Sequence, residues 1–236
     1  GEIEGMVMSL HPDQAVRDSI LRIRDKVEKA KRSKSWKDGI NEMNEALKRE
    51  GIDIPIMEVY SPPRVNGMAN ALGLASGLSL DLTELDPDDG MPWDFTKKDK
   101  RDKVMDMVLG KKALLLIGSP LCTAFSQLQN WNFKKMSREK RDEIINKGRE
   151  HFNFCMLLYR IRHENGMYFL HEHPHSATSW KMPEVEEIMG LDGVELTKGD
   201  MCAFGMYQDT EEGRKLVLKP TGFMTNAKEI GNELNK

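Results

Sequence analysis

The sequence predicts an α/β fold with a mostly parallel sheet, and two observations lead to this prediction. Short apolar runs typical of strands recur at residues 52–61, 77–82, 111–119 and 166–174. Helix-like segments lie between them, at residues 65–76 and 137–165. Parallel neighbours need a long crossover connection, usually a helix, so strands that alternate with helices indicate a parallel sheet.

The first 52 residues predict an N-terminal helical arm, ahead of an α/β domain over residues 53–236. A helix start lies at Pro12, and a second helix over about Trp36–Arg49 stops before Gly51. The arm carries a basic cluster that includes Lys31 and Arg32. Such a cluster either contacts phosphates or forms a solvated helix face, and the second is the commoner case.

The C-terminal part predicts short strands at the edge of the sheet, over residues 200–207 and 215–226. A final helix follows from about Ala227. Edge strands are typically short and carry mixed polar and apolar residues, as these do.

Composition excludes several classes of protein. With 39% hydrophobic and 31% charged residues the chain is globular, and its net charge of −3 means that any nucleic-acid contact must come from a local patch. Its three cysteines form no CxxC pair, which argues against a disulfide framework and favours an intracellular protein. No apolar run approaches the ~20 residues of a membrane span.

Unusual polar residues cluster at the predicted carboxyl ends of the strands, where open α/β sheets bind ligands. Cys122 follows a strand and a Gly-Ser-Pro exit. Near a helix start the local dipole favours a thiolate, so Cys122 is either a nucleophile or a small core residue. Asp81 and Asp94 follow the second strand, and each could accept ribose hydroxyls or cap the next helix.

Residues 171–175 admit three interpretations. On a strand, His171 and His173 share one face and Glu172 takes the other. The histidines, with His175, could bind a metal, because a His-x-His pair is a recurrent ligand spacing. Alternatively Glu172 is an active-site acid with structural histidines, or all of them ring a polar loop.

Together these residues resemble the DNA cytosine-5 methyltransferases. The stretch GSPLCTAFS is similar to the family's catalytic loop, Gly-x-Pro-Pro-Cys-Gln-x-Phe-Ser. The matching positions are Gly118, Pro120, Cys122, Phe125 and Ser126. Leu121 replaces the second proline and Thr123 replaces the glutamine.

Further stretches resemble the family in the same order, over roughly residues 55–228. FLHEHP resembles the strand that ends in Glu-Asn-Val, with Glu172 for its Glu. MEVYS resembles the first strand, usually Asp-Leu-Phe-Ser, with Glu58 for the Asp. LDL and WDF fall where the family keeps acids for the ribose and the adenine. The C-terminal stretch is similar to one found in phage and mobile-element members.

The resemblance implies a Rossmann-like fold that uses S-adenosyl-L-methionine to methylate cytosine in DNA, with RNA an open alternative. It implies Cys122 as the thiolate that adds to carbon 6 of cytosine and Glu172 as the acid at ring nitrogen 3. It implies cofactor contacts by Glu58, Tyr60, Ser61, Asp81, Asp94 and Pro120. Nucleic-acid contacts are expected from Ser126 and Lys219, with Lys31 and Arg32 of the arm. The implied location is the nucleus or nucleoid.

Departures from the family keep other functions open. The first loop, SPPRVNG, has two prolines where the family is Gly-rich, and the family's Arg-x-Arg strand has no counterpart downstream of Glu172. A catalytically inactive domain that binds nucleic acid or assembles a mobile-element or viral polyprotein is therefore the first alternative. A metal-dependent hydrolase built on the histidines is the second. The N-terminal helices could also form a homodimer.

Overall fold

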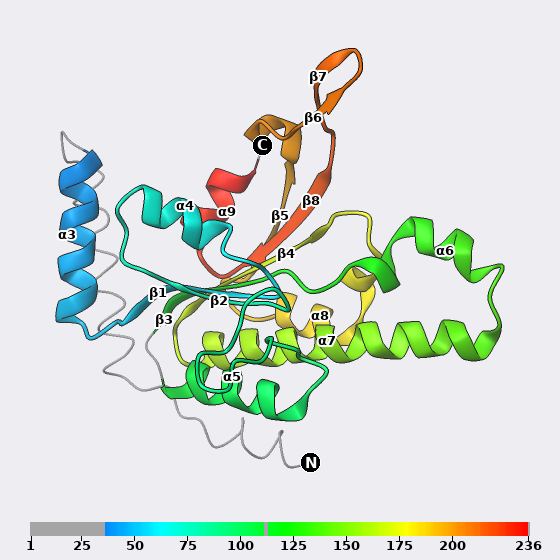
Figure 1. Ribbon diagram of the computed structural model, residues 1–236, viewed down its shortest axis with the longest axis horizontal. Helices are drawn as coiled ribbons and strands as arrows, with labels where there is room; N and C mark the ends of the chain where they lie inside the picture. Colours follow the sequence, from blue (N-terminus) through cyan, green and yellow to red (C-terminus); the bar gives the residue numbers. More distant parts are fainter. Residues whose placement is uncertain (1–35, 111–112, 236) are drawn as a thin grey trace. The chain divides into compact units, whose positions relative to one another are not determined.

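The computed structural model describes residues 36–110 and 113–235 (Figure 1). These residues fall into two compact units. One unit runs through Gly118 and also contains Leu157–Phe169; the other contains Ser119–Met156 and everything from Leu170 onward. The helix α7 (Arg138–Glu164) and the strand β4 (Tyr168–Pro174) each pass from one unit into the other. The predicted division at residue 52 stays a prediction.

The predicted α/β class is confirmed, with a mostly parallel sheet of six strands in the order β2-β1-β3-β4-β8-β5. In the first unit β1 (Ile54–Val59) lies between β2 (Leu78–Leu80) and β3 (Ala113–Gly118) and is parallel to both. In the second unit β8 (Pro220–Thr225) is antiparallel to β4 and to β5 (Glu195–Asp200). β4 and β5 therefore run in one direction, with β8 reversed between them.

Among the described residues, the first unit contains the helices α3 (Trp36–Arg49), α4 (Val65–Ala71), α5 (Lys98–Gly110) and the end of α7. The prediction of α3 is confirmed at both ends. This helix buries Ile40, Ala46 and Leu47, and the chain leaves it through Gly51, whose φ of +64° suits glycine. The first predicted helix and the basic residues Lys31 and Arg32 that follow it lie outside the described residues.

The second unit contains α6 (Gln127–Phe133), the first part of α7, α8 (Pro183–Met189) and α9 (Lys228–Leu234). The long helix predicted over residues 137–165 is confirmed as α7. The sequence pattern did not predict β5, because its side chains are mostly exposed and give little alternation. In the described part of the chain no helix is long and apolar enough to cross a membrane.

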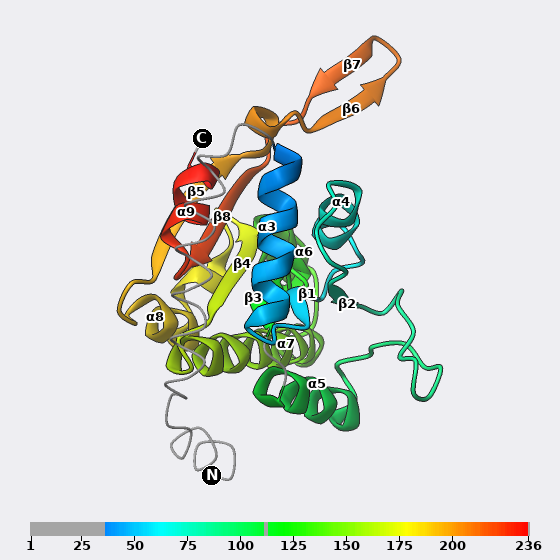
Figure 2. The ribbon, with the colours of Figure 1, turned by 90° about the vertical axis from the view of Figure 1, so that its left-hand side faces the viewer.

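The prediction that the C-terminal strands lie at the edge of the sheet is wrong for β8. This strand is an inner one, and its residues from Thr221 to Thr225 are all buried. Residues Met201–Phe204 form a 3-10 turn instead of a strand. β6 (Tyr207–Thr210) and β7 (Gly213–Leu216) pair only with each other, as an exposed hairpin that extends away from β5 and β8 (Figure 2).

Arg162 fastens the amino end of β3 within the first unit. Its guanidinium is buried and donates hydrogen bonds to the carbonyl oxygens of Ala113 and Leu114, at 2.5 and 2.9 Å, and to that of Tyr168 at 3.3 Å. Burial lowers the pKa of Arg162 to about 9. The arginine therefore acts at the amino end of the strand, opposite the end where ligands are expected.

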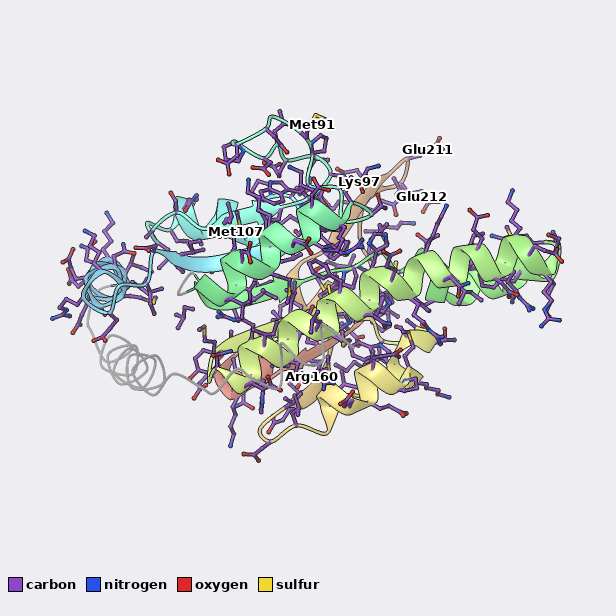
Figure 3. The ribbon with its side chains drawn as sticks, turned by 90° about the horizontal axis from the view of Figure 1, so that it is seen from below. Met91, Lys97, Met107, Arg160, Glu211 and Glu212 are labelled. Carbon is purple, nitrogen blue, oxygen red and sulfur yellow. The ribbon has the colours of Figure 1, made fainter. Side chains whose placement is uncertain are left out.

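A buried ion cluster holds the long connection between β2 and α5. Asp86 is fully buried and accepts hydrogen bonds from Lys100 and Lys103 of α5, at 2.6 and 2.5 Å. Both ammonium groups also lie near the ring of Trp93, at 5.0 and 5.3 Å from its centroid. Figure 3 shows this connection through Met91 and Lys97, with Met107 on α5. The cluster fixes a segment that has no strand or helix of its own.

We expect Asp86→Asn to lower the free energy of unfolding by about 3 kcal/mol, because it removes a counter-charge from the buried Lys100 and from the partly buried Lys103. Burial opposes ionisation of Asp86, but the hydrogen bonds from Lys100 and Lys103 outweigh it and lower the pKa from 3.8 to about 2. Stability from the ionised form is therefore present above pH 4 and is lost as the pH falls toward 2.

Urea titrations between pH 7 and 2 measure both effects. The matched control is Asp88→Asn, which also removes a partner of Lys103, but from a side chain that is 76% exposed. We expect a change below about 1 kcal/mol for this control. The prediction would be contradicted if both variants lost the same free energy of unfolding. It would also be contradicted if the stability of Asp86→Asn fell between pH 4 and 2 as that of the wild type does.

Candidate functional site

Glu58, at the carboxyl end of β1, organises the loop that follows this strand. Its Oε1 accepts hydrogen bonds from the N–H of Val65 at 3.0 Å and from Ser61 Oγ at 3.2 Å. Its Oε2 accepts from the N–H of Asn66 at 2.9 Å and from Ser79 Oγ at 3.0 Å. A carboxylate has about four acceptor sites, so protein donors fill them. Glu58, which is only 1% exposed, therefore shapes the loop from within.

The prolines of this loop leave few donors for a ligand. Pro62 and Pro63 have no N–H group, and the N–H of Arg64 donates to the carbonyl oxygen of Pro62. The N–H groups of Val65 and Asn66, at the start of α4, are taken by Glu58. The loop therefore differs chemically from a Gly-rich loop, whose backbone can approach a cofactor closely.

Tyr60 joins the ends of β1 and β2. Its φ is +62°, a left-handed conformation that a bulky residue adopts only when its surroundings enforce it. Its N–H donates to the carbonyl oxygen of Leu80 at 2.9 Å, and its ring meets that of Phe95 edge-on at 4.7 Å. The structure therefore brings together three of the predicted cofactor segments, which carry Tyr60, Asp81 and Asp94.

Asp81 and Asp94 both stabilise turns. Asp81 Oδ1 accepts hydrogen bonds from the N–H and the hydroxyl of Thr83, at 3.1 and 3.0 Å. Asp94 Oδ1 accepts the same pair of bonds from Thr96, at 3.0 and 2.7 Å. Within residues 36–110 and 113–235, Asp81 Oδ2 accepts no hydrogen bond, so this oxygen remains available to a ligand hydroxyl. Neither acid caps a helix as the alternative prediction supposed, because each stabilises a turn and the next helix, α5, begins only at Lys98; the ribose role stays a prediction.

The loop after β3 holds Cys122 in the second unit. Cys122 is partly exposed and precedes a 3-10 turn over Thr123–Phe125, where the N–H of Phe125 donates to its carbonyl oxygen at 3.0 Å. Ser126 then caps α6 by accepting from the N–H of Gln129 at 3.2 Å. Pro120 is buried. The thiol of Cys122 thus belongs to a short, well-defined turn rather than to the core, whereas Cys155 is buried.

Glu172 and Lys219 form an ion pair in the same unit. Lys219, immediately before β8, places its Nζ 3.4 Å from Glu172 Oε1 on β4. Glu172 is 29% and Lys219 45% exposed, so both side chains reach solvent. The sequence predicted each residue separately as part of a site, and the structure pairs them because β4 and β8 are neighbours.

The histidines of β4 point to the opposite face, as the alternation predicted. His171 and His173 are buried, with their rings 4.7–5.5 Å from that of Phe152 and 5.4–6.1 Å from that of Trp180. Burial lowers the pKa of His173 to about 3, with a smaller contribution from Lys219. Both imidazoles are therefore neutral core residues at physiological pH. In the described part of the chain no three His, Cys, Asp or Glu residues could hold a metal ion.

Sequence reasoning missed Asn66 and Ser79, which complete the shell around Glu58, and a basic cavity beside the turn of Cys122. Asn66 and Ser79 gave no signal, because each is an ordinary polar residue in its own segment. The cavity did leave a trace in the sequence: Arg141, Ile145 and Arg149 recur at four-residue spacing on one face of a helix.

No model of a known protein family matches this chain, and comparison with curated proteins gives no match either. The interpretation of the site therefore rests on the motifs of the chain and on the geometry described above.

The buried histidines predict a pH dependence of stability. The pKa of His173 is about 3 in the folded protein and about 6.5 when exposed, so the unfolded state binds the proton first. Stability is therefore complete above pH 6.5 and falls as the pH is lowered toward 3, by at most about 1.4 kcal/mol per pH unit for each buried histidine.

Chemical denaturation of His173→Phe checks this expectation. Phenylalanine retains a ring among Phe152 and Trp180 and cannot be protonated, and His173 Nε2 has no hydrogen-bond partner to lose in the described part of the chain. We expect a shallower dependence on pH between 6.5 and 3. His175→Gln, at an exposed position, serves as the control and should retain the wild-type slope. A variant His173→Phe with the wild-type slope would refute this assignment.

Proposed function

We propose that the protein is an S-adenosyl-L-methionine-dependent methyltransferase of Rossmann-like fold that methylates cytosine in DNA. The observation that carries this proposal is the position of β1 between β2 and β3. After β1 the chain forms β2 on one side of this strand and then β3 on the other side. The carboxyl end of β1 is therefore a topological switch point, where open α/β sheets bind ligands. Tyr60 and Asp81 lie at this edge of the sheet.

The residues present fit the cofactor best at its ribose. Asp81 keeps one carboxylate oxygen for ribose hydroxyls, and the partly exposed ring of Tyr60, which is held edge-on by the buried Phe95, lies on the adjoining loop. Glu58 supports the loop through its four hydrogen bonds and is inferred to position cofactor contacts rather than make them. When bound, the cofactor supplies an electrophilic methyl group on its sulfonium.

Cys122 and Glu172 would carry out the chemistry on the base. The Cys122 thiolate forms a bond to carbon 6 of cytosine, and the acid Glu172 hydrogen-bonds ring nitrogen 3 to stabilise the charge that develops there. Carbon 5, now nucleophilic, would take the methyl group, which leaves the donor as its neutral thioether. A base such as water would then remove the proton from carbon 5, and the electron pair of that bond would expel the sulfur from carbon 6 and regenerate the thiolate.

Lys219 would position Glu172, because its ammonium lies 3.4 Å from the carboxylate. It would take the place of the family's Arg-x-Arg strand, which has no counterpart downstream of Glu172. A duplex substrate would have to flip its cytosine out of the stack to reach these groups. The neutral, buried histidines take no part in the chemistry.

One observation favours a second candidate, an inactive domain that binds nucleic acid or assembles with other proteins. The loop after β1 contains two prolines, and the N–H groups of Val65 and Asn66 are consumed by Glu58. Few backbone donors then remain for the cofactor's amino-acid end. Cofactor binding discriminates the two candidates directly.

We expect calorimetric titration with S-adenosyl-L-methionine to show saturable binding that Asp81→Ala weakens by about 1–3 kcal/mol, because ribose hydroxyls lose their acceptor. Asp81→Asn, which can still accept the bonds from Thr83 through its amide oxygen, separates the loss of the carboxylate from the loss of the turn. Asp53→Ala, at the amino end of β1, is the control and should bind normally. No binding to the wild-type protein, with or without DNA, would favour the inactive candidate.

We expect Cys122→Ser to abolish methyl transfer to cytosine-containing DNA, because a hydroxyl is too weak a nucleophile to add to carbon 6. Folding and cofactor affinity should stay close to those of the wild type, since the side chain is partly exposed. Cys202→Ser is the matched control, as Cys202 is also a partly exposed thiol. Transfer of labelled methyl groups by Cys122→Ser at the wild-type rate would show that the chemistry is different.

A further inference from the structure

A cavity of about 510 Å³ lies beside the turn that follows Cys122, entirely within the second unit. Its volume is in the range of sites for small ligands. Ala124 and Phe125 of the 3-10 turn form part of its wall, and Phe133 of α6 forms another part. Because the N–H of Phe125 donates to the carbonyl oxygen of Cys122, a group held in the cavity would lie directly behind the Cys122 turn.

Three basic side chains line this cavity and only one acidic one. Arg141 and Arg149 lie two turns apart on α7, and Lys134 follows the end of α6. Within the described part of the chain, Lys134 and Arg149 form no ion pair. Arg141 lies 3.4 Å from Asp142, whose other oxygen is 3.7 Å from Arg138, and all of these side chains are at least 43% exposed. The basic charge of the cavity is therefore largely uncompensated.

This charge runs against the balance of the whole chain. The net charge of the protein is −3, yet residues 127–150 contain seven lysines and arginines and four acids. A local excess of this kind attracts anions even when the total field does not. Arginine guanidinium groups match phosphate oxygens in a forked geometry, and lysine adds a point charge.

An exposed aromatic side chain accompanies the basic residues. Trp131 of α6 is 73% exposed and lies one helical turn before Lys134. An indole in water beside cations is a common platform for stacking nucleic-acid bases, whereas most tryptophans are largely buried. A base contact would then come from α6, and phosphate contacts would come from Lys134 after α6 and from the two arginines of α7.

We propose that this cavity binds a phosphate of the nucleic-acid backbone and so anchors the substrate beside Cys122. This inference rests on the proposed function and names the partner of the same site. Lys134, Arg141 and Arg149 make the phosphate contacts, and Trp131 stacks on a neighbouring base. None of these four residues belongs to the family motifs quoted above.

The test is binding of a fluorescently labelled DNA duplex by anisotropy, without cofactor and at several salt concentrations. Arg149→Gln and Lys134→Gln should each weaken binding several-fold and reduce the slope of log affinity against log salt by about 0.9. Lys147→Gln is the matched control: it removes the same charge from α7, but Lys147 lies outside the cavity lining and pairs with Glu143 at 2.8 Å. An RNA duplex of the same sequence shows which nucleic acid is preferred.

The outcomes separate this inference from the proposed function. Loss of binding in the cavity variants together with no methyl transfer by the wild type supports the phosphate site and refutes the methyltransferase. If the wild type transfers methyl groups and both cavity variants bind DNA as tightly as the wild type does, the methyltransferase is supported and the phosphate site is refuted. Affinity and salt slope equal to those of Lys147→Gln overturn the inference.

A second measurement uses the wild-type protein and does not depend on the folding of a variant. An amine-reactive reagent labels exposed lysines, and peptide mass spectrometry reports each site. Bound DNA should protect Lys134 and leave Lys147 as reactive as in the free protein. Equal reactivity of Lys134 with and without saturating DNA would overturn the proposed contact.

Discussion

The buried carboxylate of Glu58 holds together the segments on which the proposed cofactor site depends. A charge removed from water needs nearly all of its acceptor sites filled, and two backbone N–H groups and two serine hydroxyls fill them here. These donors come from the loop after β1, the start of α4 and strand β2. Glu58 thus fixes the start of α4 and holds the loop on both sides of Pro62 and Pro63. Because the same bonds use the amides of α4, the constraint that builds the loop also limits what the loop can bind.

In the second unit, the alternation of side chains along β4 decides which residues are buried and which reach solvent. Side chains of β4 alternate between its faces, so His171 and His173 enter an aromatic core while Glu172 emerges beside Lys219. A shift of one residue would bury the acid and expose the histidines. The desolvated imidazoles are thereby held neutral, and the only side chain of this trio that can act on a ligand is the carboxyl group.

Basic residues serve two different purposes in this protein. Lys100 and Lys103 are satisfied by Asp86 and its neighbours, so their charges stabilise a connection and offer nothing to a partner. Lys134 and Arg149 are basic residues like Lys100 and Lys103, but in the described part of the chain no carboxylate forms an ion pair with them. The two groups differ in whether the fold places a carboxylate within ion-pair distance of the lysine or arginine. These exposed cations keep their charge available to an anion, although the net charge of the whole chain is negative.

The sequence by itself determined the most strongly patterned strands and helices, because apolar periodicity and turn residues act locally, whereas β5 gave no such pattern. It placed α3 and α7, the four strands from β1 to β4 and the opposite faces of Glu172 and the histidines. Tertiary structure alone decided which strands are neighbours, so it moved β8 from the expected edge to the interior and paired Lys219 with Glu172. It also supplied the four donors to Glu58 and the cavity behind the Cys122 turn. The ion pair, the cavity and the bond from Ser79 to Glu58 join residues far apart in the chain, and no local pattern records which distant donor or acid will satisfy a given charge.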